Sequence, residues 1–545
     1  MKQFVFLIVL SLATIRCQTA NSGISSKSAD SCTVQLNQKS VPLFVDDDSQ
    51  NLVSLTITAN EENSPLHVSG VSIFFTAESQ TDCLEFVSVG FPTEEGEQLF
   101  GATSKIKPGK VEIEGLFETV KKEQVFNLNF KAKENADLLA TFQIERIEFD
   151  LGGSELAESI PAEPHTYRLG KVLRAAGQDD CDTYRIPGLV TTNKGSLIAV
   201  YDNRYNNSKD LQEDIDVGMS RSTDGGQTWE PMKVIMDMGE WGGRSQRLNG
   251  IGDPSVLYDH TTGTLWVAGL WISGFSEKDM LWWTSQPGMK PIETGQFVLV
   301  KSTDDGLTWS EPVNITEQIK DPAWQLMFQG PGRGITLNDG TLVFPAQFKA
   351  DIGEKALDGG QYTSHSTIVY STDGGESWHI GTGAKPNTTE AQVVQLGDGS
   401  LMLNMRDDQN RKDKSETNGR AVATTSDLGE TWTMHPTSSS ALQEPNCMAS
   451  IIAGDLKVDG QNKRVLFFSN PDNKHQRTNM TIKVSLDQGM SWPEEFQLEI
   501  YEPAGFGYSC MTMIDDETIG ILYEGVKELY FQKIPVSAVI SGDKQ

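Results

Sequence analysis

The chain has 545 residues, which is more than one ordinary domain needs and enough for two or three. Hydrophobic residues make up 37%, charged residues 22%, and there are 50 glycines, a composition typical of a turn-rich β protein. The formal net charge of −30 argues against a nucleic-acid partner, because phosphate binding depends on clustered Lys and Arg. An anionic ligand would therefore need a local cluster of arginines within an acidic protein.

The first residues have the layout of a secretory signal peptide. Lys2 precedes the apolar run 4–12, and small and polar residues follow. We expect residues 1–22 to be a signal segment and the protein to be exported to the periplasm, the cell surface or the medium. A lipid anchor on Cys17 is an open alternative, although Arg16 fits that motif poorly. No later stretch is long and apolar enough to be a membrane helix.

Residues 23–160 contain strands in which apolar and polar side chains alternate. The alternation is clearest at 52–59, 71–76, 125–131 and 140–149. It predicts a small antiparallel β-sandwich. Such an accessory domain often binds carbohydrate, but this segment has no Trp, so a purely structural role is an equal alternative.

The cysteines indicate neither a metal site nor a nucleophile. Five cysteines follow the expected signal segment, an odd number without C-x-x-C spacing, so at least one thiol stays free. Cys32 and Cys83 lie in the same expected domain and could form a disulfide. The seven histidines form no metal-binding motif, and we expect no metal and no cofactor.

A polar segment at 154–164, with two prolines, has the composition of a linker. Beyond it, within 161–545, an octad of the form Ser/Thr-x-Asp-x-Gly-x-Ser/Thr-Trp occurs five times. The copies lie at 222–229, 302–309, 371–378, 425–432 and 485–492. Recurrence at intervals of roughly 50 to 80 residues indicates repeated supersecondary units.

Each octad is expected to form a turn between two strands. Its Asp accepts hydrogen bonds from nearby backbone, its Gly adopts a conformation that other residues resist, and its Trp packs into the sheet. Five copies cannot all face one active site, so we interpret these Asp residues as structural. About 375 residues at roughly 60 per blade predict six blades, and 527–534 is expected to close the ring by pairing with the first blade.

Three arginines occupy positions that do not repeat. Arg185 lies in Tyr-Arg-Ile-Pro, Arg406 ends Leu-Asn-Met-Arg, and Arg477 precedes the strand before the last octad. Taken singly, each is most simply a surface salt bridge. All three together, ahead of expected blade turns, are harder to explain in that way. Three guanidinium groups that converge on one point can hold a carboxylate, and the family resemblance described next implies that these three do.

The Arg-Ile-Pro motif and the five octads together closely resemble the bacterial exo-sialidase (neuraminidase) family, of the secreted type found in gut Bacteroides. The resemblance implies an all-β fold, a six-bladed β-propeller preceded by the sandwich, with 161–545 as the catalytic domain. It implies that Arg185, Arg406 and Arg477 bind the carboxylate of sialic acid. The expected partners are sialylated glycans, glycoproteins and glycolipids, and we expect a monomer.

The resemblance also implies a tyrosine nucleophile. Tyr508, in Gly-Phe-Gly-Tyr, matches this residue, Glu390 matches its base, and Glu524 matches the carboxylate that orients Arg185. A phenol titrates near 10, so it needs a base at hydrogen-bond distance. A neutral phenol suits the reaction because sialic acid carries a carboxylate on its anomeric carbon, which would repel an anionic nucleophile.

The acid and two pocket residues complete the implied site. Arg204 matches an additional pocket arginine, and Asp210 matches the acid/base aspartate. Asp253 matches the residue that receives the N-acetyl amide or a sugar hydroxyl, with a turn Asp before Pro as an equal alternative. Four nearby carboxylates are rivals to Asp210: Asp202, Glu213, Asp214 and Asp216.

These residues predict a retaining exo-α-sialidase that acts through a tyrosyl-enzyme intermediate. Two alternatives stay open, an intramolecular trans-sialidase and a non-catalytic propeller that binds sialic acid. Gln329 and Arg333 lie in a glycine-rich strand end expected to face the central funnel. This segment is not a phosphate loop, because it lacks the Lys-Ser/Thr ending.

Overall fold

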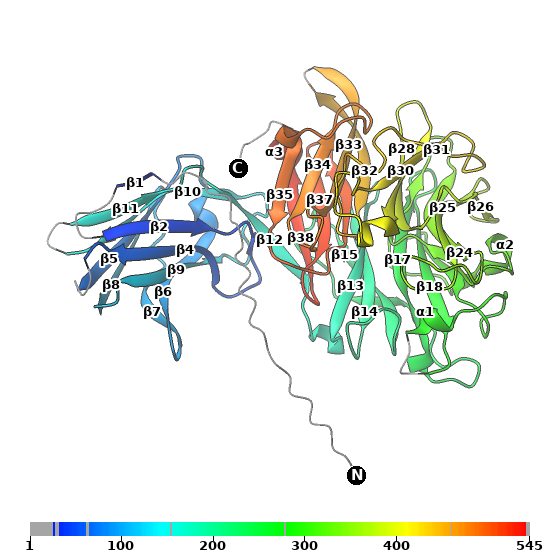
Figure 1. Cartoon of the computed structure of the whole chain (residues 1–545), viewed down its shortest axis with the longest axis horizontal. Coiled ribbons are helices and arrows are strands. Elements are labelled where there is room, and N and C mark those ends of the chain that lie inside the picture. The colour runs from blue at the N-terminus through cyan, green and yellow to red at the C-terminus, as the bar shows by residue number, and fades with distance from the viewer. Residues whose placement is uncertain are drawn as a thin grey trace, which may run out of the picture.

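The computed structural model describes residues 25–27, 32–61, 65–152, 155–276, 280–458 and 460–540. The expected signal segment and Cys17 lie outside them. The described chain is nearly all β-structure, with a sandwich beside a propeller (Figure 1). Its helices are single turns, none long enough to cross a membrane: α1 (Leu281–Thr284), α2 (Thr316–Ile319), α3 (Val536–Ile540), and the 3-10 turns η1 (Thr81–Cys83), η2 (Gln178–Asp180), η3 (Gln246–Leu248), η4 (Asp408–Arg411) and η5 (Glu494–Phe496).

The first domain is a sandwich of two antiparallel sheets. One sheet contains, in order, β1 (Ser25–Lys27), β11 (Leu156–Ile160), β10 (Thr141–Asp150), β5 (Leu66–Phe75) and β8 (Lys110–Thr119). The other contains β2 (Cys32–Gln38), β4 (Gln50–Ala59), β9 (Glu123–Ala132), β6 (Leu84–Thr93) and β7 (Gly96–Thr103). Alternate side chains of β9 and β10 point inward, so Phe126 and Phe149 meet with ring centroids 5.5 Å apart. Cys83 is a free, buried thiol, so the disulfide with Cys32 does not form.

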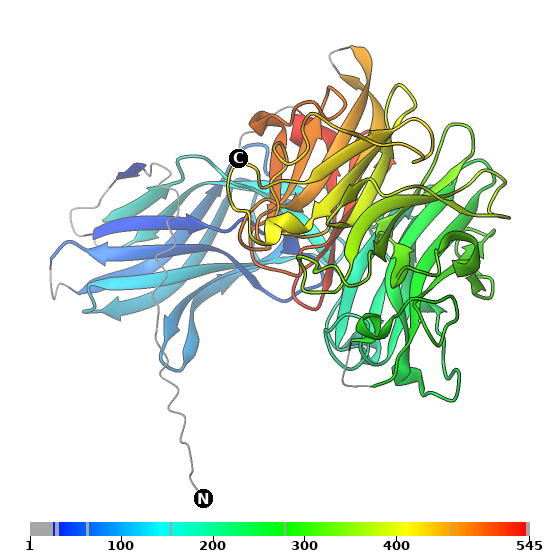
Figure 2. The same ribbon diagram turned by 45° about the vertical axis from the view of Figure 1, so that its right-hand side comes forward.

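The junction between the domains is a strand that belongs to both. The start of β12 (Thr166–Arg174) pairs with β10 of the sandwich, and its end pairs with β38 (Leu529–Pro535) of the propeller. Part of 154–164 is the strand β11 rather than an open linker, because its backbone pairs with β1 and β10. The parallel strand β3 (Leu43–Phe44) also joins β12, and Phe44 packs on Tyr530 at 4.4 Å. Figure 2 shows the two domains side by side.

The second domain is the predicted six-bladed propeller. Blade 1 holds β13 (Thr183–Thr191), β14 (Leu197–Arg204), β15 (Ile215–Ser222) and β16 (Lys233–Met236). Blade 2 holds β17 (Asn249–Asp259), β18 (Thr264–Ser273), β19 (Gln296–Ser302) and β20 (Val313–Asn314). Blade 3 holds β21 (Leu326–Gln329), β23 (Ile335–Thr336), β24 (Leu342–Ala350), β25 (Thr363–Ser371), β26 (His379–Ile380) and β27 (Lys385–Pro386).

The last three blades complete the ring. Blade 4 holds β28 (Thr388–Gln395), β29 (Leu401–Asp407), β30 (Ala421–Thr425) and β31 (Thr433–Met434). Blade 5 holds β32 (Ser450–Val458), β33 (Gln461–Pro471), β34 (Met480–Ser485) and β35 (Gln497–Tyr501). Blade 6 holds β36 (Ser509–Asp515), β37 (Thr518–Glu524), β38 and β12. The ring therefore closes through β12, which leads into blade 1, and not through a strand of the blade 1 sheet.

All five octads form turns between the third and fourth strands of a blade, as predicted. In the first, Ser222 Oγ donates to Asp224 Oδ1 (2.8 Å), while Asp224 accepts from Thr228 N (2.9 Å) and Oγ1 (2.6 Å). The other four copies repeat this pattern. Because strands alternate in direction, all octads lie on one face of the propeller, which we call the octad face.

The opposite face, which we call the site face, is where the inner strands begin. Three of these strands lose regular pairing there: the register shifts beside Arg185 in β13, beside Asp253 in β17 and beside Glu390 in β28. Bulges of this kind bend a strand and re-aim its side chains. The irregular strand ends therefore coincide with predicted site residues.

Candidate active site

All nine predicted site residues lie at the site face. They come from five blades: Arg185 on β13, Arg204 at the end of β14, Asp210 in the loop after it, Asp253 on β17, Glu390 on β28, Arg406 on β29, Arg477 before β34, Tyr508 before β36 and Glu524 at the end of β37. Several of them line a cavity of about 200 Å³. Its predicted members are Asp210, Asp253, Glu390, Arg406 and Tyr508.

The center of the site is a hydrogen-bonded trio. The Tyr508 hydroxyl donates to Glu390 Oε1. Arg406 Nη1 donates both to Glu390 Oε2 (2.6 Å) and to the Tyr508 oxygen (3.2 Å). A carboxylate this close can take the phenolic proton, and the guanidinium can stabilize the negative charge that results.

Two further guanidinium groups lie against the Tyr508 ring. The central carbons of Arg185 and Arg477 are 5.0 and 5.6 Å from its centroid. Burial raises the pKa of Tyr508 well above its ordinary value, and the Glu390 carboxylate acts in the same direction, against the three arginines. Tyr508 is therefore a neutral phenol at rest, and its proton must be removed as it reacts.

Glu524 holds this arrangement together. Its buried carboxylate accepts from Arg185 Nε (2.9 Å) and Nη2 (3.3 Å), and from the backbone N–H of Ile186 (2.9 Å) and of Tyr508 (2.8 Å). Ile186 has a φ of 57°, which is strained for a β-branched residue. The carboxylate thus fixes the two backbones that carry the arginine and the phenol.

Arg477 is the triad member with the most freedom to bind an anion. Its Nη1 donates to the Phe506 carbonyl (2.7 Å) and its Nη2 to the Asn446 carbonyl (3.3 Å). Within the described residues it has no carboxylate partner. Asn446 also accepts from Arg406 Nη2 through its side chain (2.9 Å), so one residue positions two of the three arginines.

Asp210 lies at the cavity wall between two arginines. Its Oδ1 is 3.2 Å from Arg185 Nη1 and 2.7 Å from Arg204 Nη1, and its side chain is 48% exposed. Desolvation in the cavity would raise the pKa of Asp210, but Arg204 and Arg185 outweigh it and lower that pKa to about 2. The free site therefore holds Asp210 as a carboxylate.

The four rival carboxylates have other partners. Asp202 accepts two bonds from Arg204 and one from the backbone of Asp253, Glu213 pairs with Arg247 at 2.7 Å, and Asp216 accepts from Tyr205. Asp214 lies beside Gln246. None of the four lines the cavity with Tyr508, whereas Asp210 does.

Asp253 is held by its backbone, which leaves its carboxyl for the cavity. Its N–H donates to Asp202 Oδ1 (2.8 Å), its carbonyl accepts from Gln329 Nε2 (2.6 Å), and its φ is 55°. Burial raises the pKa of Asp253 well above its usual range, and the nearby Asp202 and Asp210 add to this. Its carboxyl is therefore less acidic than an exposed one, and in its protonated form it can donate a hydrogen bond to a sugar oxygen.

Sequence reasoning missed one wall of the cavity. Lys349 of β24 donates to Tyr362 Oη (2.7 Å), and Tyr362 donates to Asp358 Oδ2 (2.5 Å). Burial lowers the pKa of Lys349 to about 7. The signal available was a Lys at an inward position of a strand otherwise made of buried residues, which is rare without a partner.

The described residues contain no group of three His, Cys, Asp or Glu side chains placed to hold a metal ion. The donors that face the cavity are guanidinium, phenol, carboxyl and ammonium groups. Such a set binds an anionic, polyhydroxylated ligand and can supply a nucleophile, a base and an acid.

Sequence comparison relates the chain to a repeat family and to known sialidases. A family model described as a BNR repeat-like domain matches residues 195–522. A sialidase of Bacteroides fragilis (strain YCH46) is 41% identical over 540 residues, which cover 93% of this chain and 95% of that protein. A sialidase of Micromonospora viridifaciens is 31% identical and covers 65% of this chain and 51% of that protein.

Two solved structures are also similar. A Hadza microbial sialidase, Hz136, has a TM-score of 0.83 at 38% identity and covers 92% of this chain and 99% of that chain. An intramolecular trans-sialidase from Ruminococcus gnavus, in complex with oseltamivir carboxylate, has a TM-score of 0.55 at 18% identity and covers 68% of this chain and 98% of that chain. At 18% identity, the similarity to the Ruminococcus gnavus structure shows a shared fold only.

Proposed function

The chain belongs to the BNR-repeat family of sialidases, glycoside hydrolases that cleave sialic acid, and from this premise we propose a retaining exo mechanism with Tyr508 as nucleophile. One observation carries the proposal: the Tyr508 hydroxyl is hydrogen-bonded to Glu390 at a cavity bordered by three guanidinium groups. The substrates are glycans, glycoproteins and glycolipids that end in sialic acid.

Binding begins with the substrate carboxylate. Among the described residues Arg477 has carbonyl partners only. Arg406 donates to the Tyr508 oxygen, and Arg185 and Arg477 lie 5.0 and 5.6 Å from the centroid of its ring, so a substrate carboxylate beside this ring can bond to all three. This contact fixes the anomeric carbon beside the Tyr508 oxygen, because the carboxylate is attached to that carbon. Asp253 then bonds to a substituent of the sugar ring, while Arg204, whose side chain is fully buried, holds Asp202 and Asp210 in place.

The first chemical step forms a tyrosyl ether. Glu390 takes the phenolic proton as the Tyr508 oxygen bonds to the anomeric carbon, and the bond from that carbon to the leaving oxygen breaks. Asp210 gives a proton to the leaving oxygen. Arg406, which contacts both the phenol and Glu390, stabilizes the charge that moves between them.

The second step reverses the roles. Asp210 takes a proton from water as the water oxygen bonds to the anomeric carbon from the face the leaving group vacated. The bond to Tyr508 breaks, and Glu390 returns the proton to the phenolic oxygen. Two inversions give net retention of configuration.

The low pKa of Asp210 in the free site has a consequence for this cycle. Its salt bridges to Arg185 and Arg204 keep it ionized, yet the first step needs it protonated. The incoming carboxylate competes for Arg185, and each lost salt bridge raises the pKa of Asp210. The substrate thereby prepares its own acid, and Asp253, a carboxyl on the same cavity whose pKa is raised by burial, supplies a second hydrogen-bonding group.

Incubation with sialyllactose, followed by NMR, tests the proposal. A retaining hydrolase first releases the α-anomer of sialic acid, which then converts to the β-anomer in solution. Immediate release of the β-anomer would contradict a covalent intermediate. An intramolecular anhydro sugar as the main product would identify a trans-sialidase instead, and binding without any product would identify a lectin.

We further propose that the enzyme is exported, a proposal supported by the layout of residues 1–22. Terminal sequencing and mass spectrometry of the native protein distinguish a lipid-anchored enzyme from a released one. A mature chain that begins at a lipid-modified Cys17 is anchored, and one that begins near Ala20 is released.

A further inference from the structure

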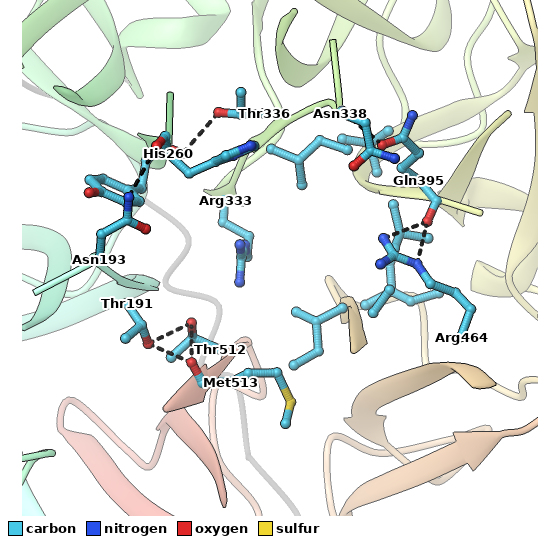
Figure 3. A pocket seen from close by; sticks show the side chains of 17 residues that line it. Thr191, Asn193, His260, Arg333, Thr336, Asn338, Gln395, Arg464, Thr512 and Met513 are labelled. Carbon is cyan, nitrogen blue, oxygen red and sulfur yellow. Dashed lines mark hydrogen bonds between the residues drawn. The ribbon is translucent and has the colours of Figure 1, made fainter. Parts of the chain in front are cut away.

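The central channel has a second mouth on the octad face. The strands that begin at the catalytic cavity end here: β13 reaches Thr191, β28 reaches Gln395, and β36 reaches Thr512 and Met513. Their ends enclose a separate cavity of about 330 Å³ (Figure 3). This cavity shares no lining residue with the catalytic cavity.

Arg333 reaches this cavity because the inner strand of blade 3 is broken. Between β21 and β23 the chain leaves its own sheet, and β22 (Gly332–Arg333) pairs in parallel with β17 of blade 2. Gly332 has a φ of 102°, and a Cβ on Gly188 would lie 2.5 Å from the Gly332 carbonyl oxygen. The detour thus depends on two glycines. Figure 3 shows the Arg333 side chain pointing into the middle of the ring of lining residues.

The Arg333 guanidinium is poorly satisfied. Its Nη1 donates to the Met511 carbonyl at 3.2 Å, and its Nε is buried without a hydrogen-bond partner. No carboxylate of the described residues pairs with it, and none of the described residues that line the cavity is Asp or Glu. In a protein with 75 acidic and 45 basic residues, a partly buried arginine without an acidic neighbour is unusual.

The other basic residues of the cavity do not share this feature. Arg464 donates to the Gln395 carbonyl (3.1 and 2.9 Å) and pairs with Asp455 at 2.7 Å. His260 lies at the exposed rim, where its carbonyl accepts from Asn193 (3.0 Å). The cavity is therefore open at its rim and has one uncompensated cation near its center.

We propose that this cavity is a second ligand site, in which Arg333 binds a small oxyanion, a carboxylate or a phosphate, through its free guanidinium N–H groups. A planar guanidinium offers two parallel donors that match such a group. Because its lining residues are distinct from those of the catalytic cavity, this site can be occupied while the catalytic cavity is filled.

Oxyanion titrations of the full chain test the proposal, with the catalytic arginines first occupied by a saturating unsaturated sialic acid analogue. Sodium phosphate and sodium acetate, at constant ionic strength with chloride as balance, are added in separate arms. We expect a saturable rise in Tm and a calorimetric binding isotherm in at least one arm, because a ligand that binds only the folded chain stabilizes it. The arm that responds identifies the oxyanion.

Three variants locate the binding. Arg333→Gln should abolish the response and leave hydrolysis of sialyllactose unchanged, while Arg333→Lys, which keeps the charge but loses the paired donors, should weaken it. Arg146→Gln, which removes a partly exposed arginine of the sandwich, is the charge-matched control and should respond as the native chain does. No saturable response in the native chain, or an equal one in Arg333→Gln, overturns the proposal. Either result leaves the sialidase mechanism untouched, because that is measured separately as turnover.

Discussion

The two faces of the propeller use the same residue type in opposite ways. On the octad face, Asp304 is a partly exposed turn residue, and hydrogen bonds from Thr308 lower its pKa to about 2. On the site face, burial raises the pKa of Asp202 to about 6 and also raises that of Asp253. The repeated aspartate accepts hydrogen bonds that hold a turn, whereas the two unrepeated ones are desolvated in the interior. Aspartates that recur in every octad are therefore structural, and the candidate catalytic residues are found among those that do not recur.

The largest effect should come from Tyr508→Phe on the site face. Removing the phenolic oxygen removes the nucleophile, so we expect kcat for an aryl sialoside to fall on the order of 10³-fold. The fold should survive, because the ring and its contacts with the arginines remain. Steady-state kinetics and the thermal midpoint measure the two effects. Tyr501→Phe is the matched control, a tyrosine of β35 outside the cavity, and should keep full activity.

Unchanged turnover in Tyr508→Phe would remove this residue from the mechanism and leave the site-face geometry without a chemical role. Retained binding of a sialoside by the inactive variant would support the separation of binding by the arginines from reaction at the phenol. Both measurements use the same protein preparation.

Asp210→Asn should have the next largest effect, and one that depends on the leaving group. Without an acid, hydrolysis of sialyllactose should fall by about 10²–10⁴-fold, whereas an activated aryl sialoside needs no proton and should lose about tenfold or less. Comparing kcat/KM for the two substrates measures the difference. Asp214→Asn, in the same loop but outside the cavity, is the control. Equal losses on both substrates would count against an acid role for Asp210.

Much of the octad face could be predicted from the sequence. The octads fix turns through local hydrogen bonds, and local bonds leave a local signature, so blade number and turn positions follow from counting. The closing strand β38 was also visible as an alternating segment near the C-terminus. Its partner was not, because β12 pairs across more than 350 residues of chain. The expected linker contains β11, which forms a hairpin with the preceding strand β10 and also pairs with the distant strand β1.

The site face was only partly predictable. Tyr508 and the triad arginines came from motifs, and Asp210 was chosen from five carboxylates by resemblance. What distinguishes Asp210 physically is that its rivals are bound elsewhere, a fact of packing. No sequence motif marks Lys349 at the wall of the catalytic cavity. None marks β22 either, the segment that carries Arg333 to the cavity on the octad face. Bulges and buried pairings depend on contacts between distant segments, which one sequence does not display.

A pH experiment tests the comparison further, because a buried carboxyl near the site face, that of Asp216, has no role in the proposed mechanism. Burial raises the pKa of Asp216 to about 8, with Asp237 and Asp214 adding to it. The native chain then holds a proton on Asp216 that the unfolded chain has lost above about pH 4, so its stability falls as pH rises from about 4 to 8 and levels off beyond. Asp216→Asn cannot ionize and should be more stable than the native chain by roughly 2–4 kcal/mol at about pH 9.

Denaturant unfolding across that pH range measures the effect. The two proteins should converge in stability near pH 4, where Asp216 is protonated in both states. Activity should be unchanged, since Asp216 does not line the cavity. A constant difference at all pH values would mean that the substitution acts through packing rather than through the carboxyl proton.

The smallest effect should come from the octad face. Asp224→Ala removes an acceptor of three hydrogen bonds within one turn, from Ser222, from Thr228 N and from Thr228 Oγ1. Loss of such a turn residue costs about 1–2 kcal/mol, since the donors are exposed and can bond to water instead. Urea unfolding should show that loss while kcat and KM stay at native values, because the octad lies on the face opposite Tyr508. Asp224→Asn, which keeps the side-chain carbonyl acceptor, should recover part of the stability. A fall in kcat without a change in stability would show that the octad face communicates with the catalytic cavity, and the division of roles between the two faces would then be wrong.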